Sequence, residues 1–291
     1  MNEKVVQLKG RIISVDVLRG LAMFLILSTQ IGGARIWSSL FNLLWGDNNW
    51  PQFVSNQMSW SNEHVSFMNI AQSIFLFVVG VVIPYSMKKR LEKNDKSKIY
   101  LQIFIRSAIL FLFGLIAGGK LLNMPQYNRT LANIPVYNNV LEYIALTYLV
   151  VCIIVLNTKV KTQYIITAVL LLLYWVVWYI PAPGGTGDPF SKEGLNIGMY
   201  VERLVLGNHV SNFGAWTGVF NTVSHIMLAL IGALCGHLLF FSAIPKIEKF
   251  KKLLIAGIAM IVAGELWGLV YPVMRCFMTS TFVLVSGGVS V

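Results

Sequence analysis

Charged residues are scarce in this sequence: Asp, Glu, Lys and Arg together make up only 12% of its 291 residues. An average soluble domain carries about twice that share. Hydrophobic residues account for 56%, and the mean hydropathy is +0.68. Several apolar runs are long enough to cross a bilayer as helices. The scarcity of charge therefore excludes an ordinary soluble domain and indicates a polytopic membrane protein.

Cysteine is also scarce. Cys152, Cys235 and Cys276 are scattered through apolar segments. Their spacing matches neither a disulfide framework nor a metal-binding pattern. We therefore interpret them as buried thiols and expect no bound metal.

Acidic residues are outnumbered by basic ones, 12 to 23, which gives a net charge of +11. The distribution of this charge argues against nucleic-acid binding, because the basic residues cluster at alternate connections between apolar runs. Fifteen Lys and Arg residues fall in four predicted inner segments and six fall in the predicted outer ones; the inner segments are 1–11, 88–98, 159–161 and 246–252. This bias predicts a cytoplasmic N-terminus and an even number of spans.

The apolar runs are continuous rather than alternating, which favours helices over the strands of a closed barrel. We predict an all-α helix bundle with about eight transmembrane helices, in a single domain over residues 1–291. The predicted spans are 17–35, 69–87, 101–119, 140–157, 163–180, 221–243, 253–272 and 277–291. Because the sequence stops at Val291 within an apolar run, we expect either a short last helix or missing C-terminal helices.

Polar residues within the predicted spans fall into two zones, and an ionisable residue at membrane depth is a functional candidate by default. A helix rises about 1.5 Å per residue, which gives the depth of each position within its span. The outer zone contains Gln30, Asn69, Gln72, Glu142, His225 and Glu265, with His64 and Asp188 in the long outer connections 36–68 and 181–220. The inner zone contains Arg11, Asp16, Arg19, Arg106, His237 and the basic cluster 88–90. The outer zone suits a polyhydroxylated or amine-bearing substrate, and the inner one suits phosphate groups.

Each zone also has a purely structural interpretation. Asp16 and Arg19 are three residues apart and can pair on one helix face. The 88–90 cluster can set topology and contact lipid headgroups. His225 can make an ordinary hydrogen bond between helices, and Glu142 can face the outer aqueous boundary.

Six segments, in order along the chain, resemble the heparan-α-glucosaminide N-acetyltransferase family and its bacterial relatives. They are RIISVDVLRGLAMFLIL (11–27), IFLFVVGVVIPYSMKKR (74–90), NNVLEYIALTYLV (138–150), PGGTGDPFSKEGLNIGMYVERLVLG (183–207), FNTVSHIMLALIGALCGHLL (220–239) and PVMRCFMTSTFVLVSGG (272–288). The resemblance implies a bacterial cytoplasmic-membrane acyltransferase. It would move an acetyl group from cytosolic acetyl-CoA to an extracytoplasmic amino sugar or glycan.

The resemblance also implies roles for individual residues. The catalytic candidates are His64, Gln30 and Asn69. The substrate-binding candidates are Glu142, Asp188, His225 and Glu265. The candidates for binding acetyl-CoA are Arg11, Asp16, Arg19, Arg106 and Lys88. Self-association as a homodimer is left open.

Several positions depart from the family pattern. Gln30 stands where relatives carry Asn or Glu, Asn69 where they usually carry Asp, and Ser73 where they often carry Pro. His64 reaches the position of the family's histidine only with a gap of about five residues; without the gap, Ser59 stands there. The alternative is therefore a catalytically inactive protein, or a transport or binding protein, on the same scaffold.

Overall fold

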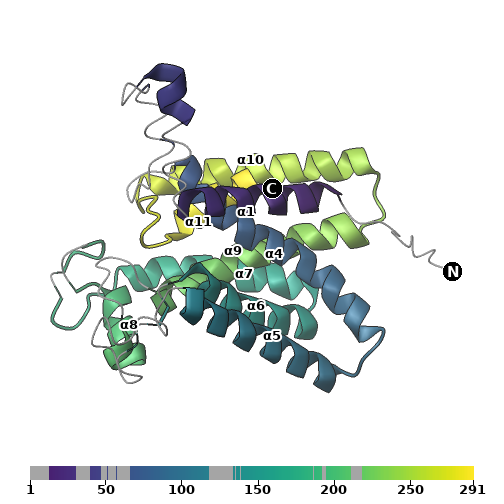
Figure 1. Ribbon diagram of the computed structural model, residues 1–291, viewed down its shortest axis with the longest axis horizontal. Helices are drawn as coiled ribbons and strands as arrows, with labels where there is room; N and C mark the ends of the chain where they lie inside the picture. Colours follow the sequence, from purple (N-terminus) through teal and green to yellow (C-terminus); the bar gives the residue numbers. More distant parts are fainter. Residues whose placement is uncertain are drawn as a thin grey trace.

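The computed structural model describes residues 13–30, 40–46, 51, 57, 66–117, 134, 136–137, 139–185, 187–191, 195–210 and 218–291. Throughout these residues the regular structure is helical, which confirms the predicted all-α class. The helices are α1 (Ile13–Gln30), α4 (Phe67–Leu91), α5 (Lys96–Ala117), α6 (Val140–Asn157), α7 (Val160–Trp178), α8 (Ile197–Leu206), α9 (Gly218–Phe241), α10 (Lys246–Gly268) and α11 (Ser280–Ser290) (Figure 1).

Five described helices are long and apolar enough to cross a membrane: Asn69–Leu91 within α4, and all of α5, α6, α7 and α9. The chain is accordingly an integral membrane protein. Among the other predicted spans, α10 has charged residues near both ends, and α11 has only 11 residues. The count of eight transmembrane helices and the cytoplasmic location of the N-terminus stay predictions.

Helices α4 and α9 form the centre of the bundle and approach each other closely. Glycines make this possible: a Cβ at Gly80 of α4 would meet the backbone of Ala229, and one at Gly232 of α9 would meet the backbone of Phe77. Small residues at such crossings allow helix backbones to pack in a membrane, where the hydrophobic effect does not drive helices together.

The remaining helices flank this central pair. Helix α6 packs on α9 and α5 packs on α6, whereas α11 contacts α4 and α10 covers α11 (Figure 1). The α10–α11 contact depends on a facing glycine pair, Gly257 and Gly288. Helix α1 lies against α4, the only described helix that it contacts.

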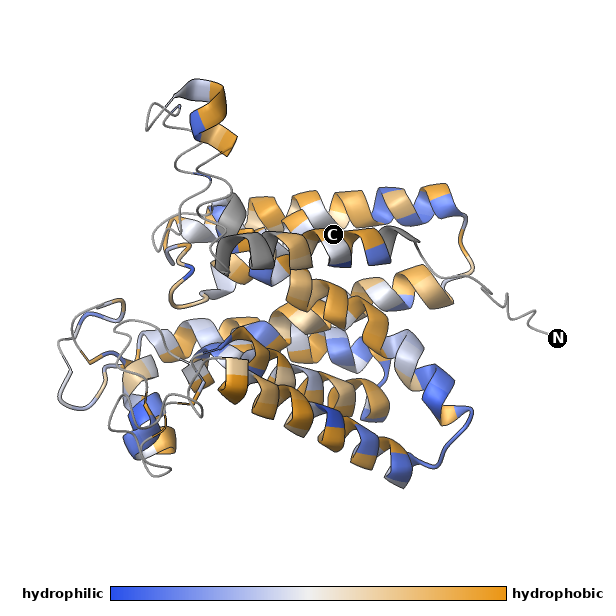
Figure 2. Cartoon of the chain, in the orientation of Figure 1, coloured by the Kyte–Doolittle hydropathy of each residue, from blue (hydrophilic) through white to orange (hydrophobic). Residues whose placement is uncertain are grey.

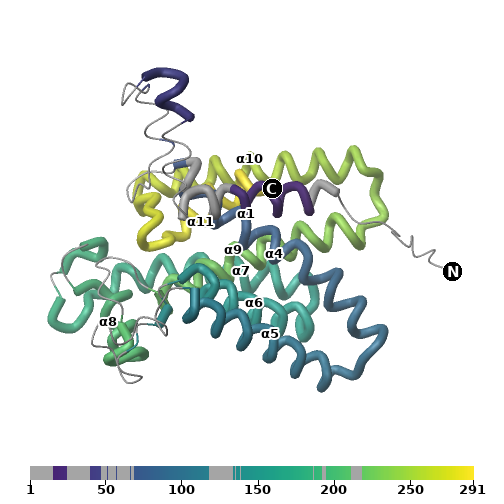
Figure 3. The backbone as a smooth tube through the Cα atoms, viewed as in Figure 1, coloured from purple at the N-terminus to yellow at the C-terminus, as the bar shows by residue number. Residues whose placement is uncertain are grey.

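The two ends of the bundle differ in character. The short connections 92–95, 158–159 and 242–245 lie at one end, together with the basic clusters around them (Figure 3). We call this the basic end. Helix α8 and the 269–279 segment lie at the opposite end, which we call the loop end. Figure 2 shows hydrophilic residues concentrated at the α4–α5 turn and apolar residues along the helices.

Candidate functional site

His225 lies two turns into α9 and is almost fully buried, with 2% of its surface exposed. Its Nε2 atom is 3.2 Å from the side-chain nitrogen of Gln72 on α4. Its ring stacks on Tyr143 of α6, with centroids 5.1 Å apart and planes 14° apart. Three helices therefore fix one imidazole near the loop end.

Tyr143 is itself held by a short bond, in which its hydroxyl donates to the backbone oxygen of Tyr137 at 2.6 Å. Tyr137 has a φ of 56°, which is uncommon for a residue with a side chain. Burial and nearby Glu142 both raise the pKa of the Tyr137 phenol. The neutral phenol is thus the favoured form there.

Glu142 occupies the first turn of α6 and is fully buried. The helix begins just before it because the Asn139 side chain accepts a hydrogen bond from the N–H of Leu141 at 3.0 Å. Gly114 of α5 makes room for the carboxylate side chain, since a Cβ there would lie 2.6 Å from its Cγ atom. The alternative interpretation, in which Glu142 faces an aqueous boundary, is therefore wrong, because the side chain is enclosed.

Glu202 of α8 connects the loop-end helix to the central one. Its carboxylate accepts a hydrogen bond from the N–H of Gly218, the first residue of α9, at 2.6 Å. An acidic side chain at a helix N-terminus satisfies a free donor and complements the helix dipole. Burial raises the pKa of Glu202 to about 7, although its backbone bonds to Gly218 and Val219 work in the opposite direction.

Arg275 is 5% exposed and lies in the segment between α10 and α11. Asn221 of α9 holds this segment, because its amide donates to the backbone oxygen of Cys276 at 2.9 Å. The Tyr174 hydroxyl lies 2.9 Å from the backbone oxygen of Phe277. Burial lowers the pKa of Arg275 to about 10, a shift that Cys276 and Tyr143 partly oppose. Arg275 is also close enough to His225 to interact with it electrostatically.

These residues form one group, which we call the loop-end cluster: Gln72, Glu142, Tyr143, Glu202, His225 and Arg275. Tyr143 is the common neighbour, because Glu202, Glu142 and Arg275 all act on it electrostatically and His225 stacks on it. The cluster combines two carboxylates, a guanidinium, an imidazole, an amide and a phenol. Such a set can bind a hydroxyl-rich or amine-bearing molecule and can move a proton.

Sequence reasoning missed three members of the cluster: Tyr143, Glu202 and Arg275. Glu202 and Arg275 had a signal, since each is a charged residue among apolar ones in a predicted outer connection: Glu202 is followed by Arg203, and Arg275 stands alone. Tyr143 had none, because one more aromatic residue in an apolar run is unremarkable.

The other predicted outer residues take different positions. Asn69 is buried on α4, one turn before Gln72. Asp188 is exposed and closes a local turn, accepting a bond from the N–H of Phe190 at 3.0 Å. Glu265 is exposed on α10, so the structure does not bring it to the cluster. His64 and the side chain of Gln30 lie outside the described residues.

The predicted acetyl-CoA residues do not form a single cluster. Arg19 on α1 and Arg106 on α5 are exposed, and their two helices do not touch. Lys88 is exposed near the end of α4, with its ammonium 4.8 Å from the centre of the Phe241 ring. Asp16 is half-buried on α1, and Arg11 lies outside the described residues.

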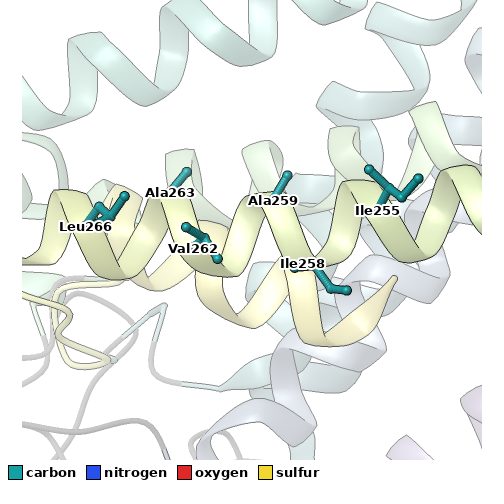
Figure 4. Close-up of a pocket in the computed structure, with 6 residues that line it drawn as sticks. All are labelled: Ile255, Ile258, Ala259, Val262, Ala263 and Leu266. Atoms are coloured by element: carbon teal, nitrogen blue, oxygen red, sulfur yellow. The ribbon is translucent and has the colours of Figure 1, made fainter.

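A separate groove of about 470 Å³ runs along α10 (Figure 4). It is lined only by apolar side chains: Ile255, Ile258, Ala259, Val262, Ala263 and Leu266. It offers no polar group to a substrate, so the loop-end cluster is the better candidate for chemistry. No protein-family model and no curated protein matches the chain.

Proposed function

We propose that this chain is a transmembrane acyltransferase that moves an acetyl group from acetyl-CoA at the basic end to an amino sugar or glycan at the loop end. The family resemblance of the sequence supplies the identity of donor and acceptor. The observation that carries the proposal is the loop-end cluster, in which buried acidic, basic and aromatic groups from four helices and the 269–279 segment gather around Tyr143.

The chemistry of the two ends supports this direction. An amino sugar presents hydroxyls and an amine, which match the carboxylates of Glu142 and Glu202 and the amide of Gln72. Coenzyme A carries phosphates, which match the lysines of the basic end. The 25 residues of α4 span about 37 Å between the two ends. A bound CoA therefore has to extend its acetyl-bearing arm into the bundle.

The reaction itself needs a base and an oxyanion stabiliser. The amine nitrogen of the acceptor attacks the thioester carbonyl carbon, the C–S bond breaks, and CoA leaves as a thiol. The proton lost by the nitrogen passes first to a base and ends on the sulfur. His64 is the predicted base, and His225 is the candidate within the described residues. Asn69 and Gln30 are the predicted amide donors to the developing oxyanion.

Inside-out membrane vesicles test the proposal. Radiolabelled acetyl-CoA is supplied outside, glucosamine is enclosed, and labelled N-acetylglucosamine is measured in the lumen. We expect labelled product with the wild-type protein and its loss, by a factor of a hundred or more, with either His64→Ala or His225→Ala. His209→Gln is the control and keeps its activity, because this histidine lies outside the loop-end cluster, with a ring nitrogen 2.8 Å from the backbone oxygen of Ile134.

The alternative, a binding or transport protein without transfer, gives a different result. Label then associates with the vesicles or enters them, yet no acetylated sugar forms. That outcome with a well-folded wild-type protein rejects the acyltransferase proposal. Unchanged turnover in both histidine variants is compatible with an acyltransferase, but it shows that neither His64 nor His225 takes part in the reaction.

A further inference from the structure

Two arginines at the basic end converge on one patch of α6. Arg90, at the end of α4, and Arg106, on α5, both act electrostatically on Tyr148 and Cys152. Gln102 connects them: its side-chain oxygen is 3.5 Å from a guanidinium nitrogen of Arg90, and it precedes Arg106 by one helical turn. Arg90, Gln102, Arg106 and Tyr148 thus form a group between α4, α5 and α6, which we call the arginine patch.

Neither arginine is neutralised by a carboxylate within the described part of the chain. Among the residues that the structure describes, no carboxylate pairs with Arg90 or Arg106. The nearest acids along the chain, Glu92 and Asp95, are exposed in the α4–α5 turn. The arginine patch therefore carries two positive charges without a counter-ion from the described part of the chain.

The surroundings of Arg106 are those of a lipid-facing surface. It is exposed on α5, and so are its neighbours Phe104, Ile105 and Ile109, at 61%, 46% and 46%. Its Cα lies about 15 Å along the helix from Lys96, the first residue of α5. A guanidinium at that depth is costly unless it reaches back toward the interface and meets an anion.

We propose that the arginine patch binds the phosphate of an anionic phospholipid in the leaflet at the basic end. Arg106 reaches toward the interface, Arg90 reaches from the end of α4, and the two guanidiniums hold the phosphate by charge-assisted hydrogen bonds. Gln102 and the half-buried Tyr148 supply further polar contacts. The acyl chains lie along the exposed apolar face of α5. This lipid site does not depend on the acyltransferase proposal, and it assigns Arg106 to lipid rather than to CoA.

Native mass spectrometry of the purified full chain tests this assignment. The probes are phosphatidylglycerol and phosphatidylcholine with identical acyl chains. We expect the wild-type protein to retain phosphatidylglycerol at least tenfold more strongly, and the Arg90→Gln/Arg106→Gln variant to lose that preference. Arg203→Gln, which removes an exposed arginine from α8, is the matched control and keeps the preference.

Three results would overturn the lipid assignment. These are no preference of the wild-type protein between the two lipids, an unchanged preference in the double variant, and displacement of phosphatidylglycerol by free CoA together with a loss of CoA affinity in the same variant. If the double variant fails to fold, Arg106→Lys replaces it. A lysine keeps the charge but not the paired donors, so we expect it to weaken the preference severalfold, and an undiminished preference contradicts the proposal.

Discussion

At the scale of single residues, the loop-end cluster is held by a few short, enclosed contacts. The hydroxyl of Tyr143 donates to the Tyr137 backbone at 2.6 Å, and Glu202 accepts from Gly218 at the same distance. Leaving a buried polar group without its partner costs more than the bond itself contributes. Single substitutions here therefore have measurable effects on stability.

Tyr143→Phe isolates one of these contacts. It keeps the ring stacked on His225 and removes only the hydroxyl, so we expect a loss of about 1–2 kcal/mol in the free energy of unfolding. Tyr179→Phe is the control, because that hydroxyl also donates to a backbone oxygen, of Val270 at 3.0 Å, but in an exposed setting. Thermal unfolding in detergent measures both. Equal losses of unfolding free energy in the two variants would contradict the claim that a buried hydrogen bond contributes more than an exposed one.

Glu202 predicts a pH dependence with a definite sign. Its pKa is raised from 4.5 to about 7, so between these values the folded protein keeps a proton that the unfolded chain has lost. The contribution of Glu202 to the unfolding free energy therefore falls as pH rises from about 4.5 to about 7, by on the order of 3 kcal/mol. Below that range both states are protonated, and above it both are ionised.

Comparing variants across this pH range isolates the contribution. Glu202→Gln keeps an oxygen that accepts from Gly218 but cannot titrate, so its melting temperature falls less steeply with pH than that of the wild-type protein. Glu248→Gln, on the exposed first turn of α10, keeps the wild-type slope. A wild-type slope in Glu202→Gln refutes this prediction.

The sequence predicts how far along a helix each polar residue lies, but not the direction in which it faces. Gln72 and His225 were placed in one zone and do meet, whereas Glu265 was placed in the same zone and is exposed. Distance along a helix gives depth alone. The direction in which Glu265 points depends on the rotation of α10 about its own axis. The contact between Gly257 and Gly288, which are 31 residues apart in the sequence, fixes this rotation against α11.

At the scale of elements, the crossing of α4 and α9 organises the bundle. Gly80, Gly232 and Gly236 each face backbone atoms of the opposite helix. A larger residue at one of these positions cannot be accommodated by a side-chain movement, because the obstacle is the backbone itself. The two helices carrying Gln72 and His225 would separate.

Gly232→Leu tests this crossing. We expect a loss of about 3 kcal/mol or more in the free energy of unfolding, or failure to fold, because the new side chain meets the backbone of Phe77. Gly20→Ala on α1 is the control: nothing lies within 4 Å of the added Cβ, so helix propensity predicts an unchanged or slightly raised stability. Thermal unfolding in detergent distinguishes the two. Similar stability of both variants would contradict the claim that the close crossing of α4 and α9 stabilises the bundle.

The helices themselves were the most predictable part of the fold. The predicted span 140–157 coincides with α6, and 69–87 falls within α4, because long apolar runs between polar turns leave few alternatives. Helix α8 was not predicted within the loop 181–220. It has only ten residues, and its start depends on a local cap in which Asn196 accepts from the N–H of Met199 at 2.9 Å.

At the scale of the whole molecule, the two ends are predicted to face opposite sides of the membrane, with the basic end in the cytoplasm. Cysteine labelling tests this orientation. Lys93→Cys lies in the exposed α4–α5 turn and Asp188→Cys in an exposed turn at the loop end. With intact cells and an impermeant maleimide, we expect labelling of Asp188→Cys alone. The unsubstituted protein is the background control; its Cys152 and Cys276 are buried as predicted, whereas Cys235 is only half-buried.

The central claim joins that orientation to the chemistry of the ends: acetyl-CoA is used at the basic end, and the acceptor at the loop end. Proteoliposomes holding the protein in one known orientation test it most directly, with radiolabelled acetyl-CoA and glucosamine supplied on opposite sides in both arrangements. The account predicts acetylated sugar only when acetyl-CoA faces the basic end and glucosamine faces the loop end. Equal product in both arrangements, or product only in the reverse one, would contradict it.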